Sequence, residues 1–223
     1  MSPPIIVITG ANRGIGLAFA KHYAATCPSG TVFLGNRGSS SDIPEQCTVL
    51  SLDLSSQSSI SDFVKKLSGR PISLLINNAG ILIKDTIQDF TIEGIQKHIL
   101  VNASAPMFLS QQLLINLKMV PNSKVVFITS RFGSIGDNSS SGYYSYRVSK
   151  SALNSLAKCF SIDLKGIVNV GLIHPGHVKT DMGGPTGEIE ADECVSRMVK
   201  IIDKLDQGNS GTFYHRDGMV LPW

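Results

Sequence analysis

Tyr146 and Lys150 lie four positions apart within residues 145–163, a segment whose apolar spacing predicts a helix. Residues four apart share one helix face, so the phenol and the ammonium are expected to be neighbours. A positive charge beside a phenol lowers the tyrosine pKa from about 10, which favours proton transfer near neutral pH. Neither Tyr143 nor Tyr144 has a lysine four positions further on. The alternative is an ordinary Tyr-x-x-x-Lys pair on a solvated helix.

Ser130 follows the apolar run 125–129, which predicts a strand. At the carboxyl edge of a sheet its hydroxyl could orient a substrate carbonyl, although turn chemistry also explains a lone serine there. A hydrolase is disfavoured because the motif G-x-S-x-G does not occur. His174 and His177 lack the convergent ligands of a metal site, and H-E-x-x-H is absent, so no metal is expected.

The segment Thr9-Gly10-Ala11-Asn12-Arg13-Gly14-Ile15-Gly16 joins an expected strand to an expected helix. Gly10 permits a tight turn, while Gly14 and Gly16 would let backbone amides approach a pyrophosphate at the helix N-terminus. The spacing is G-x-x-x-G-x-G rather than G-x-G-x-x-G, and the Lys-[Ser/Thr] of a P-loop is missing. The pattern predicts a cofactor turn, with a merely glycine-rich turn as the alternative.

The end of the second expected strand indicates which nicotinamide cofactor would bind. A carboxylate there would bond the ribose 2′-hydroxyl of NAD and repel a 2′-phosphate. This chain has Gly35-Asn36-Arg37 and no carboxylate at that place. Arg37 and Arg13 could clamp the phosphate, because guanidinium matches its geometry. NADP(H) is therefore preferred over NAD(H), unless both arginines are only solvated surface residues.

Short apolar runs alternate with segments of helical period along the chain. Strands without polar alternation, separated by helices, predict a parallel sheet covered on both faces. We expect one α/β domain over residues 1–223, a Rossmann-type doubly wound sheet of about seven strands. Pro106 should bend or divide its helix. The expected strands are residues 5–9, 31–35, 49–52, 72–76, 125–129, 168–173 and 211–214, and the expected helices are 14–26, 58–67, 91–117, 145–163 and 190–205.

Composition narrows the function classes. The chain has 223 residues, of which 42% are hydrophobic and 17% charged, with a formal net charge of +3. No run of five or six like charges occurs, so no nucleic-acid partner is expected. No segment approaches about 18 uninterrupted apolar residues, so no membrane span is expected. The four cysteines form no C-x-x-C pair and the chain start lacks a signal-peptide pattern, which together predict a cytoplasmic protein.

Taken together, these motifs resemble the short-chain dehydrogenase/reductase family along nearly the whole chain. Thr9–Gly16 is similar to its glycine-rich turn, and Asn77-Asn78-Ala79-Gly80 to its Asn-Asn-Ala-Gly element. Asn102, Ser130 and Tyr146-x-x-x-Lys150 match its active-site residues, and residues 175–180 match its Pro-Gly-x-Val-x-Thr segment. Within the family, Asp217-Gly218 and the ending Pro222-Trp223 look similar to sniffer-type and C-factor-like carbonyl reductases.

The resemblance implies roles for these residues. Tyr146 would be the general acid in reduction, Lys150 would lower its pKa and bond the nicotinamide ribose, Ser130 would bond the substrate oxygen, and Asn102 would hold a water. Asp53 and Leu54 would contact adenine, and Val178 and Thr180 the carboxamide. The full expected cofactor set is Gly10, Asn12, Arg13, Gly14, Ile15, Gly16, Asn36, Arg37, Asp53, Leu54, Asn78, Ala79, Gly80, Tyr146, Lys150, Pro175, Gly176, Val178 and Thr180.

The substrate side departs from the commonest family pattern. Ser130 and Tyr146 are 16 positions apart, a few more than in many members, and the lid segment after Thr180 is short. The expected substrate pocket comprises Ser130, Phe132, Tyr143, Tyr146 and Met182, within a wall that adds Ile81, Leu82, Ile135 and Trp223. An apolar wall favours a ketone, aldehyde or diketone reduced to an alcohol with NADPH.

The sequence leaves open the choice between two functions and the oligomeric state. An NADP-binding regulator or sensor with little turnover is the alternative function. The resemblance also allows a homodimer through the helices at residues 103–117 and 145–163, although monomeric members exist.

Overall fold

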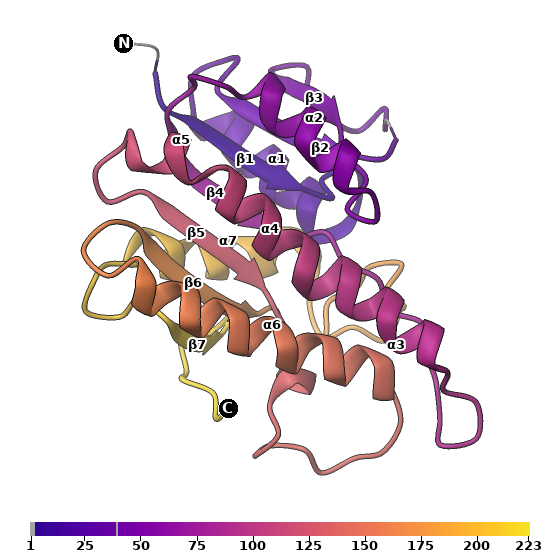
Figure 1. The fold of residues 1–223 in the computed structure, drawn as a ribbon. Helices are drawn as coiled ribbons and strands as arrows, with labels where there is room; N and C mark the ends of the chain where they lie inside the picture. The colour runs from indigo at the N-terminus through magenta and orange to yellow at the C-terminus, as the bar shows by residue number, and fades with distance from the viewer. Residues whose placement is uncertain (1–2, 39) are drawn as a thin grey trace.

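The computed structural model describes residues 3–38 and 40–223; Met1, Ser2 and Ser39, which the expected domain includes, lie outside the described residues. Seven strands and the helices that cover them follow one another in near-regular alternation (Figure 1). The strands are β1 (Ile5–Thr9), β2 (Val32–Asn36), β3 (Cys47–Ser51), β4 (Ile72–Asn77), β5 (Lys124–Ile128), β6 (Asn169–His174) and β7 (Thr212–His215). The α-helices are α1 (Gly14–Thr26), α2 (Gln57–Lys66), α3 (Ile92–Ile99), α4 (Ala105–Gln112), α5 (Leu114–Lys118), α6 (Tyr144–Asp163) and α7 (Ala191–Asp203).

The strands form one sheet in the order β3-β2-β1-β4-β5-β6-β7, and every neighbouring pair is parallel. The expected doubly wound α/β fold is therefore confirmed. The chain winds outward from β1 to β3 and then returns to place β4 on the other side of β1. This reversal opens a crevice at the carboxyl ends of β1 and β4, which is where such sheets bind ligands.

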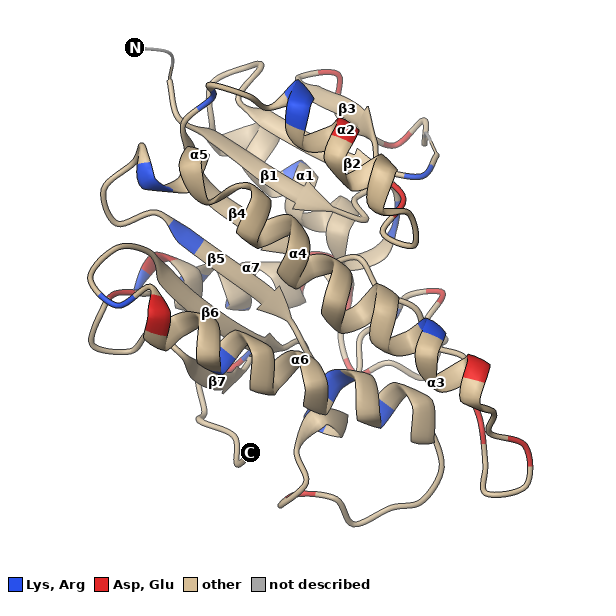
Figure 2. Cartoon of the chain, in the orientation of Figure 1, with Lys and Arg blue, Asp and Glu red and all other residues tan. Residues whose placement is uncertain are grey.

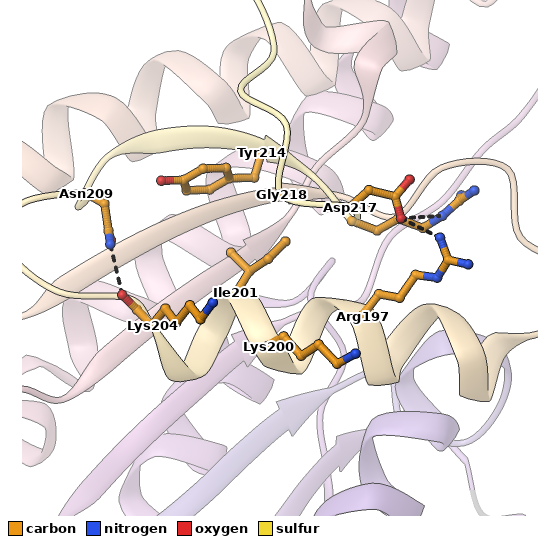
Figure 3. A pocket seen from close by; sticks show the side chains of 9 residues that line it. Arg197, Lys200, Ile201, Lys204, Asn209, Tyr214, Asp217 and Gly218 are labelled. Atoms are coloured by element: carbon orange, nitrogen blue, oxygen red, sulfur yellow. Dashed lines mark hydrogen bonds and ion pairs between the residues drawn. The ribbon is translucent and has the colours of Figure 1, made fainter.

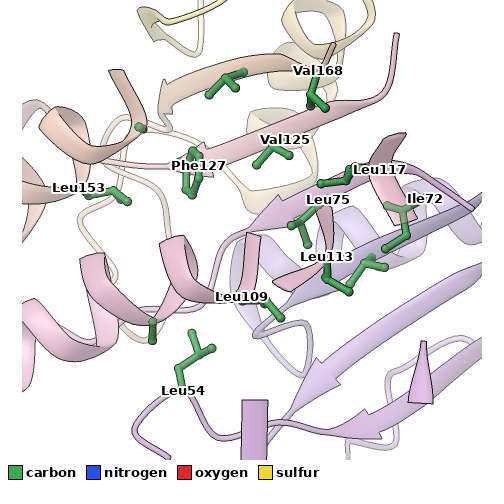
Figure 4. Close-up of a cluster of buried hydrophobic side chains, with 14 of the residues drawn as sticks. Leu54, Ile72, Leu75, Leu109, Leu113, Leu117, Val125, Phe127, Leu153 and Val168 are labelled. Carbon is green, nitrogen blue, oxygen red and sulfur yellow. The ribbon is translucent and has the colours of Figure 1, made fainter. Parts of the chain in front are cut away.

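Alternate strand residues point to opposite faces and build two separate cores. On one face, strand residues such as Val7 and Phe127 pack against α2, α4 and α6, with Phe63 and Leu109 fully buried (Figure 4). On the other face, strand residues such as Ile8 pack against α1 and α7. Lys124 is the one Lys, Arg, Asp or Glu in the strands of the described chain; other charges lie on helices and loops (Figure 2).

The helix expected at residues 91–117 forms, but it breaks at a different place from Pro106. It is not divided at Pro106, because α3 runs into α4 through a π-helical turn, Leu100–Ser104. Proline cannot donate a backbone hydrogen bond, and the preceding turn widens so that Ala105 N donates to the carbonyl of Leu100. The helical path breaks later, at Leu113. The ends of the other elements lie within two residues of their expected positions, and β1 and α1 match them.

The last residues fold back on the edge of the sheet. Tyr214 pairs with Val220 in an antiparallel bridge, and Leu221 N donates to the carbonyl of Phe213 at 2.8 Å. This return covers the outer edge of β7, which would otherwise present unpaired backbone groups. Within residues 3–38 and 40–223, no helix has the length and hydropathy needed to cross a membrane.

Candidate active site and cofactor cleft

A cleft of about 690 Å³ lies at the carboxyl ends of the central strands. Its walls come from the turn after β1, the ends of β2 and β4, helix α6 and the loop after β6. Most of the expected cofactor residues therefore meet in one place. The lining includes Gly10, Asn12, Arg13, Gly14, Ile15, Gly16, Asn36, Arg37, Asp53, Leu54, Asn78, Ala79, Gly80, Tyr146, Lys150, Pro175, Thr180 and the substrate residue Met182.

The turn from β1 into α1 offers backbone donors to the cleft. Gly10 has a φ of +66°, and a Cβ there would lie 2.8 Å from the Cα of Ala79. A Cβ at Gly16 would collide with the carbonyl oxygen of Gly10. Within the described chain, no side chain caps the start of α1 at Arg13, so the first N–H groups of the helix suit a phosphate.

Two asparagines hold this turn in place. The Asn78 side chain donates to the carbonyls of Thr9 at 3.0 Å and Gly10 at 3.1 Å. Asn36, which is buried, accepts a hydrogen bond from Ala11 N at 2.6 Å. The side chain at the end of β2 therefore faces inward toward the turn, and it carries no charge that would repel a 2′-phosphate.

The outer end of the cleft carries charged side chains of both signs. Arg13 and Arg37 both line it, as the expected phosphate clamp requires. Arg13 Nη1 lies 3.0 Å from Asp181 Oδ2, and both side chains are largely exposed. Hydrogen bonds from Ser55 lower the pKa of Asp53, and the charge of Arg37 adds to this effect. Asp53 therefore stays ionised beside the clamp.

Helix α6 brings Tyr146 and Lys150 to the cleft wall, and both side chains are more than nine-tenths buried. Lys150 Nζ donates to the Ile128 carbonyl at 2.9 Å and lies 5.6 Å from the centre of the Tyr146 ring. Ser130 lies two residues after the end of β5, outside the cleft lining, and its Oγ accepts from Phe132 N at 3.2 Å. The Ser130 hydroxyl also lowers the pKa of the Tyr146 phenol.

In this structure the pKa of Tyr146 lies above its ordinary value, not below it as expected. Burial raises the pKa of Tyr146 to about 12, and the hydrogen bond with Ser130 offsets only part of that rise. Burial also lowers the pKa of Lys150 to about 8. Removal from water disfavours the charged form of each group, which accounts for the direction of both shifts. The site therefore holds a neutral phenol beside an ammonium at pH 7.

Asn102 lies in the π-helical turn, behind the cleft wall rather than in its lining. Its Oδ1 accepts from Ile81 N at 2.8 Å, and its Nδ2 donates to the Ile81 carbonyl at 2.9 Å and to Ser149 Oγ at 3.0 Å. These bonds tie the segment after β4 to α6. The side chain thus holds the cleft wall together, and the expected water-binding role stays a prediction.

Aromatic rings surround the phenol on the substrate side. The Phe132 ring lies 5.2 Å from that of Tyr143 and 6.2 Å from that of Tyr146, centre to centre. Tyr143 has a φ of +57°, a left-handed conformation that costs a non-glycine residue energy. Its N–H donates to the Asp85 carbonyl at 2.8 Å, which holds it there. Phe132 and Tyr143 thus lie beside the catalytic candidate, outside the cleft lining.

The expected apolar wall is only partly formed. Ile81 and Leu82 line the cleft together with Met182. Ile135 does not, being 80% exposed. The Trp223 ring packs 5.7 Å from that of Phe213 on β7, so it also stays out of the lining.

Two residues of the Pro-Gly-x-Val-x-Thr segment do not face the cleft. Gly176 packs against the Arg216 guanidinium, and the Val178 side chain is buried in the core between the sheet, α1 and α7. Their neighbours Pro175 and Thr180 do line the cleft.

Sequence reasoning missed several lining residues, among them Ile83, Lys97, Val101, Thr129 and Asp181. Lys97 and Val101 are four apart on the helix that carries Asn102, so helical phase could have indicated them. Asp181 is revealed only by its tertiary contact with Arg13.

A second groove of about 630 Å³ lies between α7 and β7 (Figure 3). Arg197 pairs there with Asp217 at 2.6 Å. None of the expected site residues lines this groove, so the proposed chemistry belongs to the cleft alone.

Comparisons with known proteins agree with this geometry. The family model described as short chain dehydrogenase matches residues 4–191. The protein "C-signal" of Myxococcus xanthus is 36% identical over 164 residues, which cover 72% of this chain and 98% of that protein.

Among solved structures, the carbonyl reductase Sniffer of D. melanogaster has a TM-score of 0.90 and 28% identity over the full length of both chains. An NADPH-bound carbonyl reductase from chicken fatty liver has a TM-score of 0.86 and 30% identity, again over both full chains. Because the family model spans most of the residues that build the sheet and the cleft, the chain belongs to the short-chain dehydrogenase family of oxidoreductases.

Proposed function

We propose that the protein reduces a carbonyl compound to an alcohol with NADPH, using Tyr146 as the proton donor. The observation that carries the proposal is the buried Tyr146 phenol, beside the Lys150 ammonium, on the wall of a cleft whose turn suits a dinucleotide. The Ser130 hydroxyl acts on the same phenol and lowers its pKa. A pure binding protein has no need for all three groups together.

The preference for NADPH over NADH rests on charge. Arg13 and Arg37 line the outer end of the cleft, and Asn36 stands where a carboxylate would favour NAD. The similar carbonyl reductase from chicken fatty liver is described with NADPH bound, which supports the same preference for this chain.

When bound, the cofactor supplies a hydride to the carbonyl carbon. Negative charge then develops on the substrate oxygen, and donors placed beside that oxygen stabilise it. The Ser130 hydroxyl donates a hydrogen bond, and the Tyr146 phenol transfers its proton to the oxygen. The Lys150 ammonium stabilises the phenolate that remains. A phenol that is neutral before the reaction has the proton that reduction consumes.

Apolar carbonyl compounds fit the surroundings of the phenol best. Ile81, Leu82 and Met182 line the cleft, and the rings of Phe132 and Tyr143 lie next to Tyr146. Apolar or aromatic ketones, aldehydes and diketones can bury surface against such a wall, whereas a sugar phosphate would leave its charges poorly solvated.

The test is to follow oxidation of NADPH and NADH side by side with aromatic diketones, quinones, aldehydes and keto-esters. Tyr146→Phe should keep its NADPH affinity and lose at least about 100-fold in turnover. Full turnover in that variant would refute the role of Tyr146. Faster oxidation of NADH would refute the cofactor preference and leave the mechanism standing.

The similarity to the protein called C-signal favours a second candidate, an NADP-binding regulator with little turnover. It predicts micromolar NADPH binding without reduction of any carbonyl across the same panel. Tyr146-dependent turnover of any panel compound would exclude it.

We further propose that two copies associate through α4 and α6, which lie side by side (Figure 1). Val148, Leu156 and Ile162 on α6 are exposed at 43%, 39% and 63%. Ile162→Glu should shift a dimer toward monomer in sedimentation experiments, whereas a wild-type chain that sediments as a monomer would contradict the proposal.

A further inference from the structure

The loop at residues 175–189 forms one wall of the cleft without support from regular secondary structure along most of its length. Its two ends are tied together, because Lys179 N donates to the Ile189 carbonyl at 2.9 Å and Glu188 N to the His177 carbonyl at 2.7 Å. The loop carries Pro175, Thr180 and Met182 into the cleft lining. Its placement therefore decides the shape of that wall.

Arg216, the residue directly after β7, contacts both ends of this loop. Its side chain is 6% exposed. Nη1 donates to the Pro175 carbonyl at 2.9 Å, and Nη2 donates to Glu188 Oε2 at 2.6 Å. The backbone N–H of Arg216 also donates to the His174 carbonyl at 2.9 Å. One residue thus links the beginning and the end of the loop to the sheet.

The loop is shaped around this guanidinium. Gly176 has a φ of +75°, and a Cβ there would collide with Nη1 of Arg216. The glycine thus provides both the backbone conformation and the space that the arginine occupies. A lysine could not reproduce the arrangement, because its single ammonium cannot serve two separated acceptors with the planar fork of arginine.

A neighbouring arginine has no such role. Arg197 shares the carboxylate of Asp217 with Arg216, lying 2.6 Å from Oδ1 while Arg216 Nε lies 4.0 Å from it. Its other partner is Glu193, on its own helix (Figure 3 shows its side chain beside Asp217). It makes no hydrogen bond or ion pair with the loop among the described residues. Arg197 is therefore a matched control for the loss of one positive charge.

We propose that Arg216 is a positioning residue for cofactor binding: by joining Pro175 and Glu188 to β7, it holds Pro175 and Thr180 where they contact NADPH. The inference rests on the proposed function for its ligand. Arg216 lines the second groove and not the cleft, so it acts through the loop and not by touching the cofactor.

The test compares Arg216→Met, Arg216→Lys and Arg197→Met with the wild-type chain. Hydrogen exchange without cofactor reports loop order, and an NADPH titration reports affinity without needing a substrate. In Arg216→Met, the amides of Lys179, Gly184 and Glu188 should exchange faster while those of β4 keep their protection. The dissociation constant for NADPH should rise about tenfold or more, as expected when a binding wall is displaced. Loop exchange and NADPH affinity in Arg216→Lys should lie between those of Arg216→Met and the wild type. In Arg197→Met both should match the wild type.

Different outcomes separate the two proposals. Unchanged loop exchange and NADPH affinity in Arg216→Met would overturn the positioning role while leaving the proposed function intact. Equally faster exchange throughout the sheet would also overturn it, because Arg216 would then serve global stability. A wild-type chain that binds no NADPH would refute the proposed function and the cofactor part of this inference together, whatever the exchange data show.

Discussion

Lys150→Met should change how the stability of the protein depends on pH. The wild-type ammonium is buried at the cleft wall, and burial lowers the pKa of Lys150 to about 8 from an ordinary 10.5. The folded state therefore binds this proton less tightly than the unfolded state does. Below pH 8 both states carry the charge, and the folded protein bears the cost of burying it.

The sign and size of the effect follow from that difference. Between pH 8 and 10.5 the folded state releases the proton while the unfolded state keeps it, so the free energy of unfolding rises with pH. Each pKa unit corresponds to about 1.4 kcal/mol, so the full change is about 3 kcal/mol. Burial raises the pKa of Tyr146 to about 12, so that phenol stays neutral across this window. Lys150→Met removes this contribution.

Urea unfolding at intervals from pH 7 to 10.5, without cofactor, measures the effect. The difference in unfolding free energy between Lys150→Met and wild type should move by about 3 kcal/mol in favour of the wild type as pH rises. Lys158, exposed on the same helix, is the control, and Lys158→Met should run parallel to the wild type. Parallel profiles for Lys150→Met and wild type would refute the reasoning, because they would mean that the buried amine titrates as it does in water.

The remaining predictions concern the cofactor and the loop. Replacing Arg13 and Arg37 together by Ala should weaken NADPH binding by about 10- to 100-fold, because each can donate a charge-assisted hydrogen bond, and should leave NADH binding within a few-fold; equal losses for both cofactors would contradict the clamp. Gly176→Ala should lower the free energy of unfolding by about 2–4 kcal/mol in denaturant experiments, because the added methyl group collides with the Arg216 guanidinium and alanine disfavours the positive φ. An unchanged unfolding midpoint would show that the loop moves aside. In single-turnover experiments Tyr146→Phe should form almost no product. Product formation at the wild-type rate would assign proton transfer to another group.

The fold and the place of the site could be predicted from the sequence because both depend on local patterns. Uninterrupted apolar runs such as residues 5–8 are typical of strands in a sheet covered on both faces. The turn at Thr9–Gly16 must follow a strand and open a helix, so its position in the fold was determined along with its sequence. Tyr146 and Lys150 share a face because helical geometry alone brings positions four apart together.

Other properties depend on what surrounds each residue in three dimensions. The sequence shows a lysine near Tyr146, but only the packed structure shows that burial raises the pKa of Tyr146. Likewise, the helix around Pro106 widens instead of dividing, and Asn102 in that turn braces Ile81.

The contact between Arg216 and Pro175 joins residues 41 positions apart and leaves no local pattern. The sequence by itself determined the fold, the cleft and the candidate chemistry, because short-range periodicity and motif spacing encode them. Only the tertiary structure decided the protonation states and the residues that hold the cleft walls, because desolvation and long-range hydrogen bonds exist only once the chain has packed.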